Sequence, residues 1–143
     1  METVTVNKVN IPENVNELKE ILKKNIKLFP EIKKKIENDS TRILLKPNMV
    51  APVSYKQGAT TNPYLLKALI EIIREKSKNE ILIADGSAVG QPTEEVFLEL
   101  GYQEIIDNYK NVRFINFKNQ KFIEKNNFGG DVLKNLNIPE VLN

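Results

Sequence analysis

RILLKPNMVAPVSYKQGATTNPYLL, residues 42–66, decides the fold of this chain. The apolar run Ile43–Leu45 is typical of a strand, and it ends at Lys46-Pro47-Asn48, where a proline interrupts strand pairing. A polar loop follows, and Thr60-Thr61-Asn62-Pro63 then carries residues that favour the start of a helix. Strand, loop and helix in this order place a site at the end of the strand.

A second apolar run, Ile81–Ala84, lies beyond that helix. Between the two runs, apolar residues recur at helical spacing over 63–76. Both runs are apolar at consecutive positions, which indicates strands covered on both faces, as in parallel sheets between helices. We therefore predict a βαβ unit in a three-layer, Rossmann-like α/β fold, with a mostly parallel sheet of about four to five strands and helices on both faces.

The flanking segments predict further elements of the same kind. Alternating β-branched residues over Thr3–Val9 predict a first strand, and helical spacing predicts a helix over 14–28. Pro30 is suited to open a second short helix that ends near Glu37. Further along the chain, we predict a helix that Thr93 caps and that runs to Leu100, with Gly101 at its end, and a second helix over 102–109. A strand over 112–117 and an edge strand over 121–124 should follow. The last predicted elements are a turn at 128–131, a short strand over 132–136, and a helix or turn from 138.

The length and charge of the chain indicate how many domains it forms and which partners are excluded. The 143 residues suffice for one hydrophobic core, so we expect residues 1–143 to form a single α/β domain. Charged residues make up 28% of the chain but balance to a net +2, and lysines alternate with glutamates along the predicted helices, which argues against a nucleic-acid partner. No apolar run approaches the roughly 18 residues of a membrane span, so we expect a cytoplasmic domain with no membrane partner.

The chain contains no cysteine and no histidine. Without thiolates it can form no disulfide and no cysteine-held iron–sulfur cluster or zinc site. Without imidazole it has no Ser-His-Asp triad and no HExxH zinc site. No metal site is predicted, the cofactor is unknown, and neither an iron–sulfur cluster nor zinc is expected within this segment. Any chemistry falls to Lys, Asp, Glu, Tyr, Ser or Thr.

Polar side chains follow both strands of the βαβ unit. Because carboxyl ends of neighbouring parallel strands meet at one edge of the sheet, Lys46 and Asp85 should lie close together. Free N–H groups in the first turn of the intervening helix would add about 0.3–1 kcal/mol for an anion through the helix dipole. The predicted binding residues are Lys46, Asn48, Thr60, Thr61, Asp85 and Ser87. The predicted ligand is an anionic small molecule or a phosphate-bearing cofactor.

These residues also have ordinary structural explanations. Lys46 can extend from a strand end into solvent, Asn48 can close a turn, and Asp85-Gly86 is a common loop pair. The loop GSAVG at 86–90 matches neither GxGxxG nor GxxxxGKS/T, so it is a weak nucleotide signature. The long loop that carries Tyr55-Lys56 is a candidate lid.

The blocks LLKPNMVAP, ATTNPYLLKALIEIIRE, ILIADGSAVG and TEEVFLELGY, within residues 42–102, resemble the family called domain of unknown function 362 in order and spacing. That family's pattern has a strand ending in Lys-Pro-Asn, a Thr-Thr-His-Pro helix start and a strand ending in Gly-Asp-Ser. Here Asn62 stands in place of the His, and Asp85-Gly86-Ser87 replaces the usual order. Because an amide does not titrate, the resemblance gives position 62 no role in proton transfer.

The resemblance implies a longer protein, of which this chain is the N-terminal part. In many members it also implies a Cys-rich, ferredoxin-like segment that holds iron–sulfur clusters. The strand-loop pattern is similar, more loosely, to the N-terminal domain of nickel-dependent lactate racemase.

Besides the ligand-binding domain described above, two hypotheses about function remain open. In one, the chain is the N-terminal half of an enzyme, iron–sulfur-associated or racemase-like, that a missing C-terminal domain completes. Lys46 would then stabilise charge and Asp85 would act as a base. In the other, the chain is a structural or docking domain for a redox protein partner.

Overall fold

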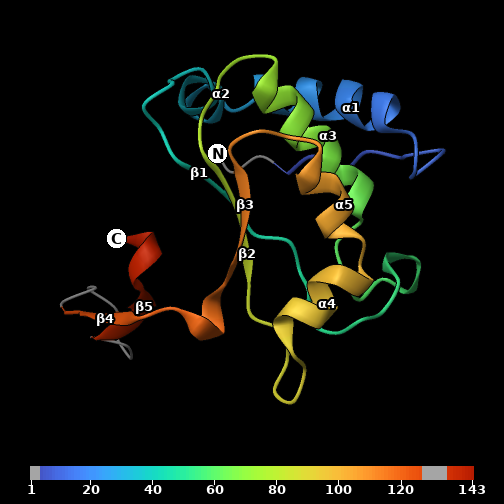
Figure 1. Ribbon diagram of the computed structural model, residues 1–143. Helices are drawn as coiled ribbons and strands as arrows, with labels where there is room; N and C mark the ends of the chain where they lie inside the picture. The colour runs from blue at the N-terminus through green and yellow to red at the C-terminus, as the bar shows by residue number, and fades with distance from the viewer. Residues whose placement is uncertain (1–3, 127–134) are drawn as a thin grey trace.

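A parallel sheet of three strands forms the centre of the molecule (Figure 1). The computed structural model describes residues 4–126 and 135–143. Strands β1 (Ile43–Leu45), β2 (Ile81–Asp85) and β3 (Val112–Asn116) lie in that order, and both neighbouring pairs are parallel. The α/β class and the predicted βαβ unit are therefore confirmed, while the parallel sheet has three strands instead of the four to five expected.

Helices precede, connect and follow these strands (Figure 1). The described helices are α1 (Val15–Lys27), α2 (Pro30–Ile36), α3 (Pro63–Arg74), α4 (Thr93–Glu99) and α5 (Tyr102–Asp107), with single turns η1 (Tyr55–Gln57), η2 (Phe117–Asn119) and η3 (Glu140–Leu142). All the predicted helices from α1 to α5 are confirmed, because their bounds differ from the expected ones by no more than two residues.

Side-chain caps explain where α1 and α3 begin. The Asn14 carboxamide oxygen accepts the N–H groups of Asn16 and Glu17, at 3.1 and 3.2 Å, and so caps α1. Asn62 caps α3 in the same way, with Pro63 at the first helical position as predicted. The predicted Thr93 cap is wrong, because Thr93 lies inside α4.

One face of the sheet carries the main core. The strand register aligns Leu45, Ile83 and Phe114 on that face, and residues from all of α1 to α5 join the same cluster. The Phe97 ring stacks on Phe114 with centroids 4.1 Å apart and lies 5.7 Å from the Tyr102 ring. Packing of this kind contributes about 25 cal/mol per Å² of apolar surface removed from water.

The opposite face is much less covered. Within the described residues its buried cluster is Leu82, Ala84 and Ile115, with Phe117 and Val141 packed against it. Every residue of β2 is buried, as predicted, but Leu44 in β1 remains 38% exposed. The expected helix layer on this face is therefore absent from the part of the chain that the structure describes.

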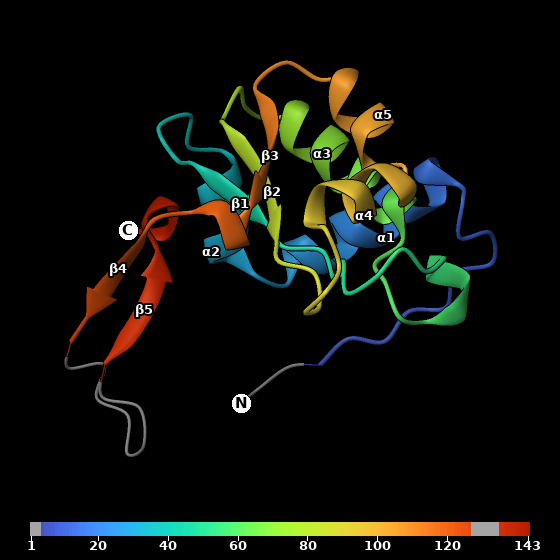
Figure 2. The same cartoon turned by 60° about the horizontal axis from the view of Figure 1, so that its bottom comes forward.

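A separate two-stranded sheet follows β3. Strands β4 (Phe122–Lys125) and β5 (Leu136–Pro139) are antiparallel to each other and pair with no strand of the parallel sheet. Figure 2 shows them projecting away from the helices. The strand predicted over 121–124 thus exists but is not an edge of the main sheet. The turn predicted at 128–131 and most of the strand predicted over 132–136 lie outside the described residues.

The predicted first strand is wrong. Residues 4–9 form no strand, and the Val6 side chain is 92% exposed. Alternation of β-branched residues reflects a preference for extended backbone, but a strand also needs a partner, and no neighbour among the described strands pairs with this segment.

Candidate functional site

The carboxyl ends of β1 and β2 bring Lys46 and Asp85 together. The Lys46 Nζ lies 2.7 Å from Asp85 Oδ1, and the Met49 N–H donates to Asp85 Oδ2 at 2.7 Å. The Asp85 side chain is only 6% exposed, whereas the Lys46 side chain is 57% exposed. A buried carboxylate therefore holds an accessible ammonium at the edge of the sheet, and this ammonium has three N–H donors, of which Asp85 takes one.

Both oxygens of Asp85 already accept hydrogen bonds. Lys46 occupies one and the Met49 N–H occupies the other. These two bonds fix the orientation of the carboxylate beside Lys46. The arrangement is thus suited to orienting Lys46.

Asn48, Thr60 and Thr61 come together beside this pair, but they bind one another and the loop. The Asn48 N–H donates to Thr61 Oγ1 at 2.8 Å, and the Thr61 N–H donates back to the Asn48 carbonyl at 3.0 Å. The Asn48 side chain donates to the Ala59 carbonyl at 2.8 Å, and the Thr60 hydroxyl donates to the Val53 carbonyl at 2.7 Å. These contacts hold the 49–59 loop against the carboxyl ends of β1 and β2, which together with Lys46 and Asp85 are called the rim below.

The first turn of α3 is already closed. Pro63 has no N–H, and the Tyr64 N–H donates to the Asn62 carboxamide at 2.8 Å. The Leu65 N–H donates to the Asn62 carbonyl at 3.1 Å. The free N–H groups expected there for an anion are therefore engaged within the helix start, which leaves Lys46 as the main attraction for an anion.

Tyr102 ties this region to α5. Its hydroxyl donates to the Thr61 carbonyl at 2.6 Å. Burial raises the pKa of Tyr102 well above its ordinary value, and the negative charge of Asp85 adds to this effect. Tyr102 therefore remains a protonated donor that fixes the start of α3.

The loop after β2 is held from two sides. The Ala88 N–H donates to the Val50 carbonyl at 2.9 Å, and Lys118 Nζ donates to the carbonyls of Ala88 and Gln91, both at 2.9 Å. The Ser87 N–H donates to the Thr93 hydroxyl at 3.2 Å. The Ser87 hydroxyl is buried and has no hydrogen-bond partner within the described part of the chain.

The end of β3 adds polar residues that the sequence reasoning missed. The side-chain amides of Asn116 and Asn119 both donate to Glu94 Oε1 at 2.8 Å. The Asn116 bond is the largest cause that lowers the pKa of Glu94. Asn116 is the last residue of β3, as Asp85 is the last residue of β2, and that position is the signal that could have revealed it.

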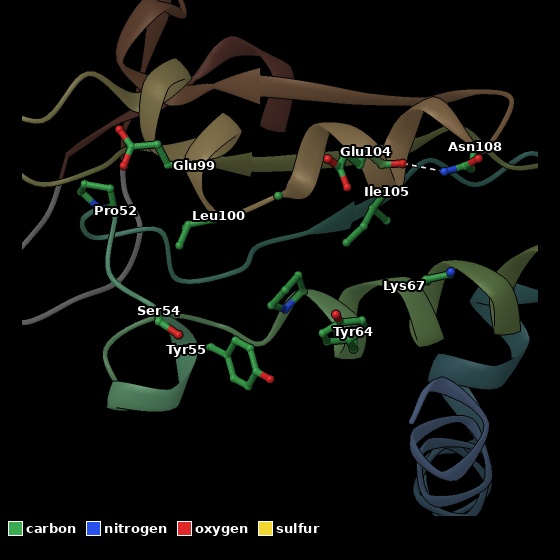
Figure 3. Close-up of a pocket in the computed structure, with 12 residues that line it drawn as sticks. Pro52, Ser54, Tyr55, Tyr64, Lys67, Glu99, Leu100, Glu104, Ile105 and Asn108 are labelled. Atoms are coloured by element: carbon green, nitrogen blue, oxygen red, sulfur yellow. Dashed lines mark hydrogen bonds between the residues drawn. The ribbon is translucent and has the colours of Figure 1, made fainter. Parts of the chain in front are cut away.

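A cavity of about 480 Å³ lies next to the rim, between the 52–55 loop, the start of α3 and the α4–α5 corner (Figure 3). Tyr55 and Tyr64 form one side, and Leu100 and Ile105 form the other. None of the six predicted binding residues lines it. Its walls come from three separated segments, and no local pattern in any of them indicates a cavity.

Glu13 fastens the Tyr55 loop to the N-terminal segment. The Tyr55 hydroxyl donates to Glu13 Oε1 at 2.6 Å, and Lys56 Nζ lies 2.9 Å from the same oxygen. The Tyr55 bond and then the Lys56 bond lower the pKa of Glu13 to about 2. Asn62 adds a bond from its amide to the Pro12 carbonyl at 2.9 Å. The predicted lid is thus a fastened loop in this structure.

Changing Glu13 to glutamine should loosen this loop. The neutral amide loses the charge-assisted hydrogen bond from Tyr55 and the ion pair with Lys56, so we expect faster proteolytic cleavage within residues 52–58. Glu20→Gln on α1 is the control, because Glu20 is an exposed glutamate. Because the folded pKa of Glu13 is depressed, the stabilisation it gives is present above its unfolded pKa and is lost as pH falls through about 2. Cleavage rates that match wild type from neutral pH down to pH 3 would contradict this role.

Neither a metal cluster nor a membrane span is present in the described ranges. Residues 4–126 and 135–143 contain no group of three or more metal-ligating side chains placed to hold an ion. No helix within these residues is long and apolar enough to cross a membrane.

Comparison with known proteins identifies the family. A search of curated proteins and a search of solved structures gave no match. The family model described as Domain of unknown function (DUF362) matches residues 43–143, which is more than half of the chain. The matched region contains the parallel sheet, the Lys46–Asp85 pair and the cavity-lining residues. The chain therefore belongs to the DUF362 family.

Proposed function

We propose that this domain binds an anionic small molecule or a phosphate-bearing cofactor at the carboxyl ends of β1 and β2. The observation that carries the proposal is the Lys46–Asp85 pair, in which a buried carboxylate presents a largely exposed ammonium at the place where parallel α/β sheets bind ligands. The Met49 N–H on the second carboxylate oxygen fixes the pair further. Lys46 is thus preorganised to meet an anion.

The other predicted residues have supporting roles in this proposal. Asn48, Thr60 and Thr61 shape the loop beside Lys46 through their mutual bonds. Asp85 orients the ammonium, and Ser87 offers a buried hydroxyl that has no partner in the described chain.

The enzyme hypothesis is the second candidate. It uses the same rim within a longer family protein, in which a further domain would close over Lys46 and Asp85. The two bonds to the Asp85 carboxylate support a role in orienting Lys46 for binding. The docking hypothesis needs no ligand at the rim.

Replacing Lys46 with alanine should weaken anion binding. We expect inorganic phosphate to raise the melting temperature of the wild-type domain, and the Kd for phosphate to rise at least about tenfold in the variant because a charge-assisted hydrogen bond is lost. Each shift is measured against the same protein without phosphate, so that any change in basal stability cancels.

Lys34→Ala provides the matched control, since Lys34 is an exposed lysine on α2 and away from the rim. Its phosphate response should equal that of wild type. If Lys46→Ala and wild type respond alike, Lys46 does not bind the anion. If neither pyrophosphate nor phosphate shifts the wild-type melting temperature, the proposed function fails and the docking hypothesis gains.

A further inference from the structure

We infer that the cavity between Tyr55, Tyr64 and the α4–α5 corner binds a small organic cation, an amine or quaternary ammonium with an apolar body. This site is separate from the proposed anion site, because neither Lys46 nor Asp85 lines it. It would give the domain two sites with opposite charge preference.

The cavity has the size and walls of a small-molecule site. Its volume of about 480 Å³ lies within the range of about 300–1,000 Å³ that is typical of ligand pockets. Pro52, Leu100 and Ile105 give it apolar surface, and Figure 3 shows Leu100 and Ile105 across the cavity from the tyrosines. A ligand with an apolar body would be covered from both sides.

Of the two tyrosine rings, that of Tyr64 suits a cation, because the Lys56 ammonium already lies 5.9 Å from the centroid of the Tyr55 ring. The centroids of the two rings are 6.5 Å apart with planes at 78°, an edge-to-face arrangement. The Tyr55 hydroxyl is held by Glu13 at 2.6 Å, so this ring is fixed before a ligand arrives. Aromatic faces attract ammonium groups by about 0.5–1 kcal/mol when exposed and by about 2 when desolvated.

Charge in the lining also favours a cation. Glu99 and Glu104 contribute two carboxylates against one ammonium from Lys67, although the whole chain has a net charge of +2. None of these three side chains forms an ion pair within 4.0 Å in the described part of the chain. Figure 3 places Glu99 at the opposite end of the cavity from Lys67.

Choline and its uncharged analogue 3,3-dimethyl-1-butanol test the inference, because the two differ mainly in charge. Amide NMR shifts of the ¹⁵N-labelled domain should report choline at the lining residues Tyr64, Gly101 and Ile105. We expect choline to bind at least about fivefold more tightly than the alcohol, which corresponds to one cation–π or ion contact.

Two double variants separate the cavity from general surface charge. Glu99→Gln with Glu104→Gln should raise the choline Kd about tenfold, whereas Glu31→Gln with Glu95→Gln removes the same charge elsewhere and should leave it unchanged. Tyr64→Leu should also weaken choline binding, with the dispersion of the NMR spectrum confirming that each variant is folded.

Several outcomes would overturn the inference. These are equal affinity for choline and the alcohol, equal loss in both double variants, or no choline shifts at the lining amides at millimolar concentration. Lys46→Ala should bind choline as wild type does, so failure of the proposed anion site leaves this test intact.

Discussion

Replacing Asp85 with alanine is expected to lower the free energy of unfolding by about 1–3 kcal/mol. The main cause is the Met49 N–H, which would lose its acceptor while Met49 stays fully buried. Loss of the Lys46 contact adds little, because that side chain is 57% exposed and its charge is screened by water. Urea denaturation measures the change.

The matched variant is Asp85→Asn. Its amide oxygen can still accept the Met49 N–H, so we expect a clearly smaller loss of stability than with alanine. Phosphate binding should weaken in both variants, since neither holds the Lys46 ammonium by charge. A loss below about 0.5 kcal/mol in the alanine variant would show that the Met49–Asp85 bond does not stabilise the rim.

Replacing Phe97 with alanine should cost about 3–5 kcal/mol, the largest effect we predict. Phe97 is buried, stacks on Phe114 at 4.1 Å and lies against Tyr102. Removing the ring leaves a void where α4 meets the sheet, and α4 carries Glu99 and Leu100 to the cavity. Choline binding should therefore weaken together with stability.

Phe97→Leu is the control for this prediction, because it keeps most of the apolar volume and should cost clearly less. Urea denaturation of both variants gives the comparison. Similar losses for alanine and leucine would mean that the ring stacking, and not the filled volume, dominates. A loss under about 1 kcal/mol for alanine would contradict the placement of Phe97 in the core.

Local signals predicted the helices well. Helical spacing of apolar residues and the caps at Asn14 and Asn62 are properties of short segments, and the structure has α1 and α3 within two residues of the expected ends. The order β1, α3, β2 was predictable for the same reason, because two apolar runs flank one helix.

Pairing and coverage were not predictable from local patterns. Residues 4–9 have strand-like composition but lack a partner strand. Ile43–Leu45 is apolar at three consecutive positions, yet this run does not specify what covers each face, and Leu44 is left partly exposed. Strand β4 has the predicted position, but it pairs with β5, which lies 11 residues further along the chain.

For the candidate site too, one part could be predicted from the sequence and another part could not. Lys46 and Asp85 could be placed together because carboxyl ends of neighbouring parallel strands meet, and the 2.7 Å contact confirms that proximity. The engagement of Thr60, Thr61 and Asn48 depends on how the loop folds back, which no spacing rule gives. Binding of a ligand by these residues stays a prediction.

Asn62 joins two parts of the molecule through one carboxamide. Its oxygen accepts the Tyr64 N–H, and its nitrogen donates to the Pro12 carbonyl. The family pattern that this chain resembles has a histidine at this place. A neutral imidazole could also supply one acceptor and one donor, but it would lose the acceptor on gaining a proton near pH 6.5. With an amide there, the joint between the N-terminal segment and α3 is insensitive to acidification in that range.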